Sequence, residues 1–208
     1  MVTKMPPSQY SSGSPSFLVD HNRTTRPLPG IEKNHADSLH AHQPSEILEP
    51  MNHTLQPGDI APDFHTIAIG GSHGEAQSIS LSSLRGKIVI LYFYPKDDTP
   101  GCTTQACGVR DNHAAIVAKG ALIYGVSIDS PASHAKFIAK HQLPFPLLSD
   151  ESRSIVEAYG VWVEKSMYGK KYMGTERTTF VIGPDGLIRA IHRKISPADH
   201  VSTILKDL

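Results

Sequence analysis

The sequence predicts an α/β domain in which a mixed central sheet is flanked by helices. Two uninterrupted apolar runs rich in β-branched and aromatic residues, 87–94 and 121–128, indicate strands that are buried on both faces. Each run is followed by a segment of helical character, and a hairpin and a further helix come later in the chain. Buried strands that alternate with helices form a sheet with helices on both of its faces.

The first part of this domain is expected to contain a hairpin, a buried strand and a long helix. Residues 63–69 and 77–84 alternate in polarity and are separated by the turn sequence GGSHG, which predicts an N-terminal hairpin. The buried strand 87–94 leads into a loop rich in Pro and Gly, and then into a helix at about residues 103–119. The second buried strand follows at 121–128.

The second part of the domain continues this alternation. Ser130 and Pro131 supply an N-cap and a first-turn proline for a helix that runs to His141. The remaining elements are a short strand, a helix closed by Gly160, a hairpin that turns at Pro-Asp-Gly, and a last helix capped by Ser196 and Pro197, at residues 145–150, 151–160, 178–193 and 196–208. This order of elements suits a thioredoxin-like fold.

Residues 1–54 differ in composition from the rest of the chain. They are rich in Pro, Ser, His and Asn, poor in large apolar residues, and show neither a helical nor a strand period. Such a segment cannot bury enough apolar surface to offset the entropy lost on ordering. We therefore expect a disordered N-terminal extension at 1–54 and a folded domain at 55–208. A chain that starts at Met51, just before the folded region, is the alternative.

Composition and charge argue against several classes of function. The 20 basic and 20 acidic residues give a formal net charge of zero, so there is no basic field that would attract nucleic acid. No segment approaches the roughly 18 consecutive apolar residues of a membrane span, and the first residues lack the apolar core of a signal peptide. Two cysteines in 208 residues do not make a disulfide scaffold. We therefore expect a cytoplasmic protein with reduced thiols.

Both cysteines, Cys102 and Cys107, follow the first buried strand. Cys102 lies where the expected helix begins, and there unpaired backbone N–H groups and the helix dipole favour a negative charge. The thiolate, which is the nucleophilic form of Cys, is therefore favoured at this position. Thr99, three residues earlier, has a hydroxyl within reach of the same place.

The spacing of five residues fits neither a CxxC redox centre nor a zinc knuckle. In a helix the two Cα atoms would be roughly 8–9 Å apart, which is beyond the about 7 Å that a disulfide spans without backbone movement. A bond between Cys102 and Cys107 therefore requires the first turns to unwind, and Gly108 lowers the cost of unwinding. An inert core thiol, or a zinc site that includes His113, are the alternatives for these cysteines.

Residues 94–111, YPKDDTPGCTTQACGVRD, resemble the active-site segment of the peroxiredoxins, and among them the bacterioferritin-comigratory (PrxQ) group. The resemblance extends through LLSDE, YGVW, GKKYMG and ERTTFVIGPDG, and covers about residues 56–208. The residues that match the positions of the family's active site are Pro95, Thr99, Cys102, Cys107 and, from a distant strand, Arg177.

Two positions of this segment depart from the family's commoner pattern. Gln105 stands where Glu is frequent, and Val109 stands where Phe is frequent. The departures do not affect Pro95, Thr99, Cys102 and Cys107. They concern a network expected on the helix surface around Arg110, which we expect to pair with acids on neighbouring elements.

The resemblance implies a thiol-dependent peroxidase that reduces hydrogen peroxide and organic hydroperoxides to water and alcohols. Cys102 would form a sulfenic acid, and Cys107 would resolve it as an intrachain disulfide that thioredoxin or a similar dithiol protein reduces. It further implies a monomer that needs no metal, haem or flavin. The alternatives are a thiol–disulfide oxidoreductase of the same fold, which the lack of CxxC argues against, and a redox-regulated binding or chaperone protein.

Overall fold

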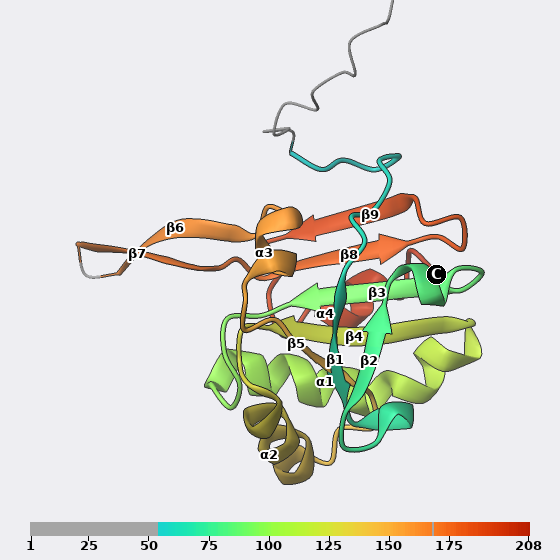
Figure 1. The fold of residues 1–208 in the computed structure, drawn as a ribbon, viewed down its shortest axis with the longest axis horizontal. Coiled ribbons are helices and arrows are strands. Elements are labelled where there is room, and N and C mark those ends of the chain that lie inside the picture. Colours follow the sequence, from blue (N-terminus) through green and yellow to red (C-terminus); the bar gives the residue numbers. More distant parts are fainter. Residues whose placement is uncertain (1–53, 168) are drawn as a thin grey trace, which may run out of the picture. The chain divides into compact units, whose positions relative to one another are not determined.

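The structure is a computed structural model that describes residues 54–167 and 169–208 (Figure 1). The described residues belong to one unit of the chain. The disordered extension predicted for residues 1–54 lies outside the described residues, apart from its last position, and it stays a prediction.

A mixed sheet of seven strands forms the centre of the described part and confirms the predicted fold class. The strand order is β2-β1-β5-β4-β3-β8-β9. Strand β4 pairs in parallel with β3 and β5, and the other neighbours are antiparallel, including the predicted hairpin β1–β2. The strands are β1 (His65–Ile69), β2 (Gln77–Ser80), β3 (Ile88–Phe93), β4 (Ala121–Ser127), β5 (Leu147–Ser149), β8 (Thr178–Ile182) and β9 (Ile188–Arg193).

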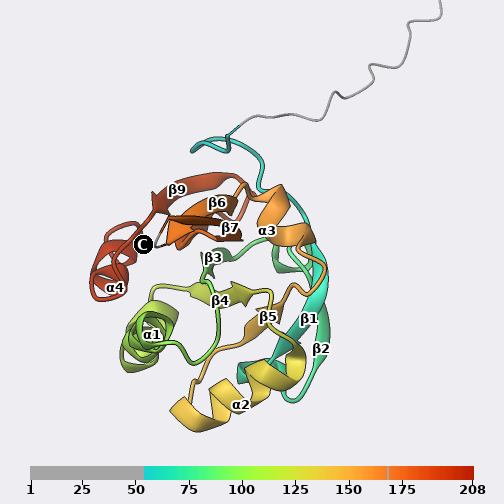
Figure 2. The same cartoon turned by 90° about the vertical axis from the view of Figure 1, so that its left-hand side faces the viewer.

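Four α-helices cover the two faces of this sheet within the described part. Figure 2 shows α1 and α4 on one side of the sheet and α3 on the other. The helices are α1 (Pro100–Ala118), α2 (Pro131–His141), α3 (Ser154–Ala158) and α4 (His200–Ile204), and two short 3-10 helices are η1 (Gly71–His73) and η2 (Ser82–Leu84).

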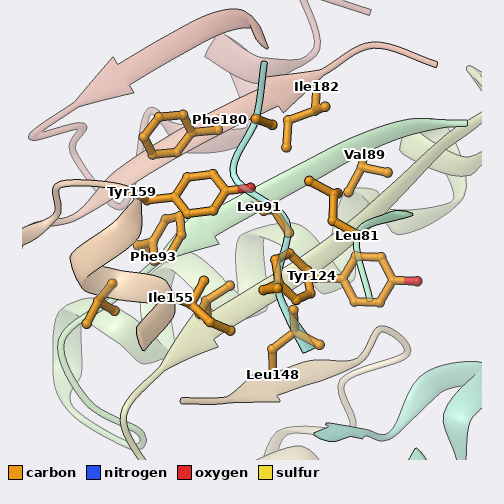
Figure 3. Close-up of a cluster of buried hydrophobic side chains, with 14 of the residues drawn as sticks. Leu81, Val89, Leu91, Phe93, Tyr124, Leu148, Ile155, Tyr159, Phe180 and Ile182 are labelled. Carbon is orange, nitrogen blue, oxygen red and sulfur yellow. The ribbon is translucent and has the colours of Figure 1, made fainter. Parts of the chain in front are cut away.

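Strand β3 lies between two hydrophobic clusters because its side chains alternate between the faces of the sheet. Val89, Leu91 and Phe93 belong to the cluster on the α3 side, which Figure 3 shows in close-up. Ile90 and Tyr92 belong to the second cluster, to which α1, α2 and α4 contribute. The uninterrupted apolar run of β3 is thus the consequence of burial on both faces.

Helix α1 begins at Pro100, three residues before the predicted start. Thr99 has the extended backbone of an N-cap residue, and its carbonyl oxygen accepts the first helical hydrogen bond, 2.8 Å from the amide of Thr103. Proline suits the first helical position because its fixed φ is helical and it has no N–H to leave unpaired. Pro100 and Gly101, which were expected in the loop, are therefore the first two residues of the helix. Cys102 consequently lies in the first turn.

Two other helix boundaries test the capping predictions. Ser130 caps α2 as predicted, since its hydroxyl oxygen accepts a 3.3 Å hydrogen bond from the amide of Ser133. Helix α3 is shorter than predicted, but Gly160 follows its last turn with φ of 62°, as expected of a residue that ends a helix.

The prediction for the last helix is wrong in extent. Only α4, five residues long, is helical in the predicted range 196–208. The amide of Asp199 bonds to the carbonyl oxygen of Ser196 at 3.2 Å, so Ser196 and Pro197 open a turn that precedes the helix, and Asp199 is the N-cap residue.

The sequence prediction also missed a hairpin made of β6 (Trp162–Met167) and β7 (Lys170–Thr175). It is a separate two-stranded sheet that extends away from the seven-stranded one (Figure 1). Most of its side chains are exposed or half-buried, so its sequence lacks the apolar run or clear alternation from which a strand is predicted.

Candidate active site

Cys102 is the third residue of α1 and follows the carboxyl end of β3. Its side chain is only 2% exposed and lies in the hydrophobic cluster that contains Tyr94 and Ala106. The backbone N–H groups of a first helical turn have no helical acceptor, and together with the helix dipole they favour an anion. The structure therefore places this thiol at the beginning of a helix and shows in addition that it is buried.

Arg177 brings a positive charge to this sulfur from 75 residues further along the chain. It lies between β7 and β8, and its Nη2 is 3.4 Å from Sγ of Cys102. The guanidinium also packs against Gly101, where a Cβ would lie 3.4 Å from the same Nη2 atom, at the short end of ordinary van der Waals contact. The geometry agrees with the expected neighbourhood of Arg177 and Cys102.

Gln105 is a site residue whose position the sequence did not indicate. Its side chain is fully buried, and its Oε1 accepts a hydrogen bond from Nη1 of Arg177. The expectation that this position belongs to a network on the helix surface is therefore wrong, because Gln105 is buried and binds Arg177. Arg110 donates to the carboxylate of Asp111 on its own helix at 2.8 Å and to the carbonyl oxygen of His141 at 3.0 Å.

Pro95 and Thr99 lie in the loop between β3 and α1, and both are half-buried. The hydroxyl of Thr99 donates to the carbonyl oxygen of Lys96 at 3.1 Å, so it is turned into the loop in this structure. The predicted role of Thr99 at the sulfur would thus require its hydroxyl to rotate when a ligand arrives.

Two aspartates of this loop, which the sequence reasoning did not single out, fasten it to α2. Asp97 is buried and binds Ser133 and His134 in the first turn of α2. Asp98 has a left-handed backbone, with φ of 55°, and pairs with Lys140 and His141 in the last turn. The only signal in the sequence is the pair of acids in YPKDDTPGC, just before the helix.

A cavity of about 470 Å³ lies beside Arg177. Its lining combines charged side chains with apolar ones, among them Lys165, Glu176, Val163 and Tyr172. Burial and the charge of Arg177 lower the pKa of Lys165, while Glu176 and Cys102 oppose the shift. The β6–β7 hairpin therefore supplies a second cation close to the cysteine.

Cys107 has quite different surroundings on the same helix. It is half-buried and lines a groove of about 530 Å³ between α1 and α4, together with Gly108, Val201 and Leu205. Both cysteines are free, and they lie five positions apart on the same helix. Among the described residues no three His, Cys, Asp or Glu side chains come together as metal ligands.

His200, the first residue of α4, is a buried group behind this site. Its Nε2 is 2.8 Å from the hydroxyl oxygen of Thr179, and its ring lies 5.4 Å from that of Tyr92. Burial, together with the charges of Arg177 and His192, lowers the pKa of His200 to about 3. The imidazole is therefore neutral in the folded protein at ordinary pH.

Residues 57–191 match the model of the AhpC/TSA family. The chain belongs to this family. It is 46% identical over 155 residues to peroxiredoxin Bcp of Bacillus subtilis, which covers 74% of this chain and 96% of that protein. Peroxiredoxin Bcp of Escherichia coli K12 is 41% identical over 151 residues, which cover 73% of this chain and 94% of that protein.

Solved structures of peroxiredoxins support the same placement. A mutant of Xylella fastidiosa PrxQ superposes with a TM-score of 0.66 and 33% identity, over 73% of this chain and 94% of that one. The Xanthomonas campestris bacterioferritin comigratory protein, whose structures were described in connection with its alkyl peroxide reduction activity, gives a TM-score of 0.63 and 37% identity, over 69% of this chain and 88% of that one.

The protein is therefore a peroxiredoxin of the bacterioferritin-comigratory (PrxQ) group with a thioredoxin-like fold, and an enzyme of the thiol-dependent peroxidase class. A peroxide substrate and a thiol reductant follow from this class. Within the described residues, no helix is both long enough and apolar enough to span a membrane.

Proposed function

We propose that Cys102 is the peroxidatic cysteine of this peroxiredoxin and that Cys107 resolves it. The observation that carries the proposal is the Arg177 guanidinium, 3.4 Å from the Cys102 sulfur at the start of α1. A fixed cation at that place stabilises the thiolate and the negative charge that develops on the peroxide oxygens.

In the first step the Cys102 thiolate attacks the terminal oxygen of the hydroperoxide. A sulfur–oxygen bond forms as the oxygen–oxygen bond breaks, and the leaving oxygen keeps the electron pair and takes up a proton, which gives water or an alcohol. Cys102 becomes a sulfenic acid. The hydroxyl of Thr99 and the first amides of α1 orient the peroxide oxygens, and Pro95 shields the sulfur from water.

In the second step the sulfur of Cys107 attacks the sulfenic sulfur, and the oxygen leaves as water when the disulfide forms. An ideal helix holds Cα atoms five residues apart at roughly 8 Å, and a disulfide requires them within about 7 Å. The first turns of α1 therefore unwind in this step. A dithiol protein, which we take to be thioredoxin or a similar reductant, then restores both thiols by exchange.

The substrates are hydrogen peroxide and organic hydroperoxides. The cavity beside Arg177 supports the second class, because its apolar side chains, Val163 and Tyr172, can accept an organic group. The activity of the Xanthomonas campestris relative toward alkyl peroxides is consistent with this assignment. We further propose that the protein is a cytoplasmic monomer. The cytoplasmic setting agrees with a chain that carries only two cysteines, both needed as thiols.

A thiol count after stoichiometric oxidation tests the proposal. The reduced chain is mixed with an equivalent of hydrogen peroxide, and wild type should lose both thiols while one intrachain bridge appears in non-reducing mass analysis. Cys102→Ser should leave the peroxide unconsumed. Equal, slow consumption by wild type and Cys102→Ser would contradict the role of Cys102. A bridge between chains would contradict both the intrachain scheme and the monomer. Size-exclusion chromatography of the reduced protein tests the monomer independently.

A further inference from the structure

A buried carboxylate belongs to the loop that leads to Cys102. Asp97 is 7% exposed, and its carboxylate accepts three side-chain hydrogen bonds. The donors are the hydroxyl of Tyr94 at 2.7 Å, the hydroxyl of Ser133 at 2.8 Å and Nδ1 of His134 at 2.9 Å. The carboxylate is thus fixed from the end of β3 on one side and from the first turn of α2 on the other.

The partner of this carboxylate is the imidazole of His134. His134 is fully buried, its Nδ1 faces the Asp97 carboxylate, and its Nε2 lies 3.2 Å from the carbonyl oxygen of Leu148. The ring therefore lies between the carboxylate of Asp97 and the backbone of β5. Asp97 and His134 form a buried hydrogen-bonded pair.

The neighbours of the pair keep the carboxylate ionised. Burial by itself would raise the pKa of Asp97, but hydrogen bonds from His134, Tyr94 and Ser133, with the charge of His134, hold that pKa below its ordinary value. Burial, followed by the charge of Asp97, raises the pKa of Tyr94 well above the usual range, so its hydroxyl remains a donor.

Separate hydrogen bonds fix the backbone on either side of Asp97 and at the start of α1. The amide of Asp97 donates to the carboxylate of Asp129 at 2.9 Å, so the backbone is fixed as well as the side chain. The hydroxyl of Thr99 donates to the carbonyl oxygen of Lys96, and the carbonyl oxygen of Thr99 accepts a hydrogen bond from the amide of Thr103. The segment that leads from Asp97 to the turn that holds Cys102 is therefore short and held by hydrogen bonds at both ends.

We propose that the Asp97–His134 pair positions the Pro95–Thr99 loop and the first turn of α1 for the reaction with peroxide, an inference that rests on the proposed role of Cys102. Neither residue touches the sulfur in this structure, so both act as positioning residues. A buried polar pair contributes little to stability by itself, because apolar residues of similar volume stabilise a protein as well or better. Its directional hydrogen bonds, in contrast, fix the loop in one orientation.

Two reactions of the same thiol separate positioning from stability. Attack on a peroxide needs the sulfur and its surrounding donors in one geometry, whereas alkylation by iodoacetamide needs a reachable thiolate. Both rates are measured at Cys102 by peptide mass spectrometry, on the full reduced chain. The variant is Asp97→Asn, and Asp98→Asn is its matched control because Asp98 is the next residue, also binds α2, but is largely exposed.

Asp97→Asn should slow the peroxide reaction of Cys102 by roughly tenfold to a hundredfold, and it should change the alkylation rate by less than about threefold. Asp98→Asn should change either rate by no more than about twofold, as expected for an exposed ion pair. An unchanged ratio of the two rates in Asp97→Asn would overturn the proposal, and so would an equal fall of that ratio in Asp98→Asn.

A second variant covers the case in which Asp97→Asn unfolds the chain. Unfolding would expose the buried Cys102 and raise its alkylation rate, and then His134→Gln, which retains one donor toward Asp97, is judged by the same ratio. The failure of the underlying function has a separate signature. If wild-type Cys102 reacts with hydrogen peroxide no faster than free dithiothreitol does, the peroxidase assignment fails, whatever the variants show.

Discussion

The first and second turns of α1 provide opposite environments for the two cysteines. Cys102 in the first turn is buried, is contacted by Arg177, and follows a loop that Asp97 fixes to α2. Cys107 in the second turn is half-buried and faces a groove whose other wall is the five-residue helix α4.

This difference matches the demands of the two chemical steps. The sulfur that meets the peroxide needs preorganised charges, because these stabilise the transition state without moving during the reaction. The sulfur that resolves the sulfenic acid must leave its helical position, so fixed polar partners would oppose its task. A groove next to Gly108 and a short helix allow this part of α1 to open at low cost.

Replacement of Cys107 gives the largest expected effect. Cys107→Ser should abolish the intrachain disulfide completely, while Cys102 still reaches the sulfenic acid and, with excess peroxide, the sulfinic acid. Mass spectrometry of the Cys102 peptide, with a sulfenic-acid trap, follows both products. If Cys102 resists oxidation to the sulfinic acid as well in this variant as in wild type, Cys107 is not the resolving residue.

Loss of Arg177, the cation that contacts Cys102, should give the next largest effect. Arg177→Met should reduce the rate of the peroxide step by roughly a hundredfold to a thousandfold, because one preorganised charged donor is lost. Stopped-flow measurement of peroxide consumption checks this. Arg193→Met is the matched control, since Arg193 lies on the neighbouring strand β9 and pairs loosely with Glu176 at 3.8 Å. A comparable loss in both variants would mean that general charge, and not contact with Cys102, matters.

The sequence carried more information about the fold than about the surroundings of Cys102. Continuous apolar runs reveal strands buried on both faces, and Ser130 and Gly160 mark helix ends through local hydrogen bonding and backbone conformation. Such signals involve residues that are close in the chain. The β6–β7 hairpin has no comparable signal, because most of its side chains remain exposed or half-buried.

The contacts of the site span long distances in the sequence. Arg177 meets Cys102 across 75 residues, and His134 meets Asp97 across 37. No local rule pairs such residues, and Arg177 was expected at the site only through resemblance to a family. Gln105 was misplaced for the same reason, since the side chain that it binds belongs to Arg177, between β7 and β8.

Acid should destabilise the folded state through His200, which lies on α4 beside the Cys107 groove. The unfolded chain binds a proton at this residue below its ordinary pKa of 6.5, whereas the folded chain resists protonation down to about 3. The folded state therefore loses stability as the pH falls through this window, by about 2–3 kcal/mol at a pH of about 4.5. His200→Gln should remove that part of the loss.

Urea unfolding at neutral and acidic pH, on wild type, His200→Gln and the exposed-residue control His65→Gln, measures this contribution. His65 lies on β1 with an exposed side chain, so its replacement should leave the acid loss as in wild type. An acid loss of equal size in wild type and His200→Gln would show that burial of this imidazole does not govern the stability of α4.

The smallest expected effect concerns the unwinding of α1 itself. A Cβ at Gly108 would lie 3.6 Å from a methyl group of Val201, an ordinary packing distance, so Gly108→Ala fits without displacing α4. Alanine stabilises a helix interior by about 0.5–1 kcal/mol relative to glycine. Because disulfide formation requires these turns to open, Gly108→Ala should slow that step by about twofold to fivefold, the same free energy expressed as a rate.

Stopped-flow fluorescence after a peroxide pulse resolves this step from the faster attack on peroxide, whose rate should change little because the first turn is untouched. If Gly108→Ala leaves the rate of the disulfide step unchanged, opening of α1 at Gly108 does not limit that step.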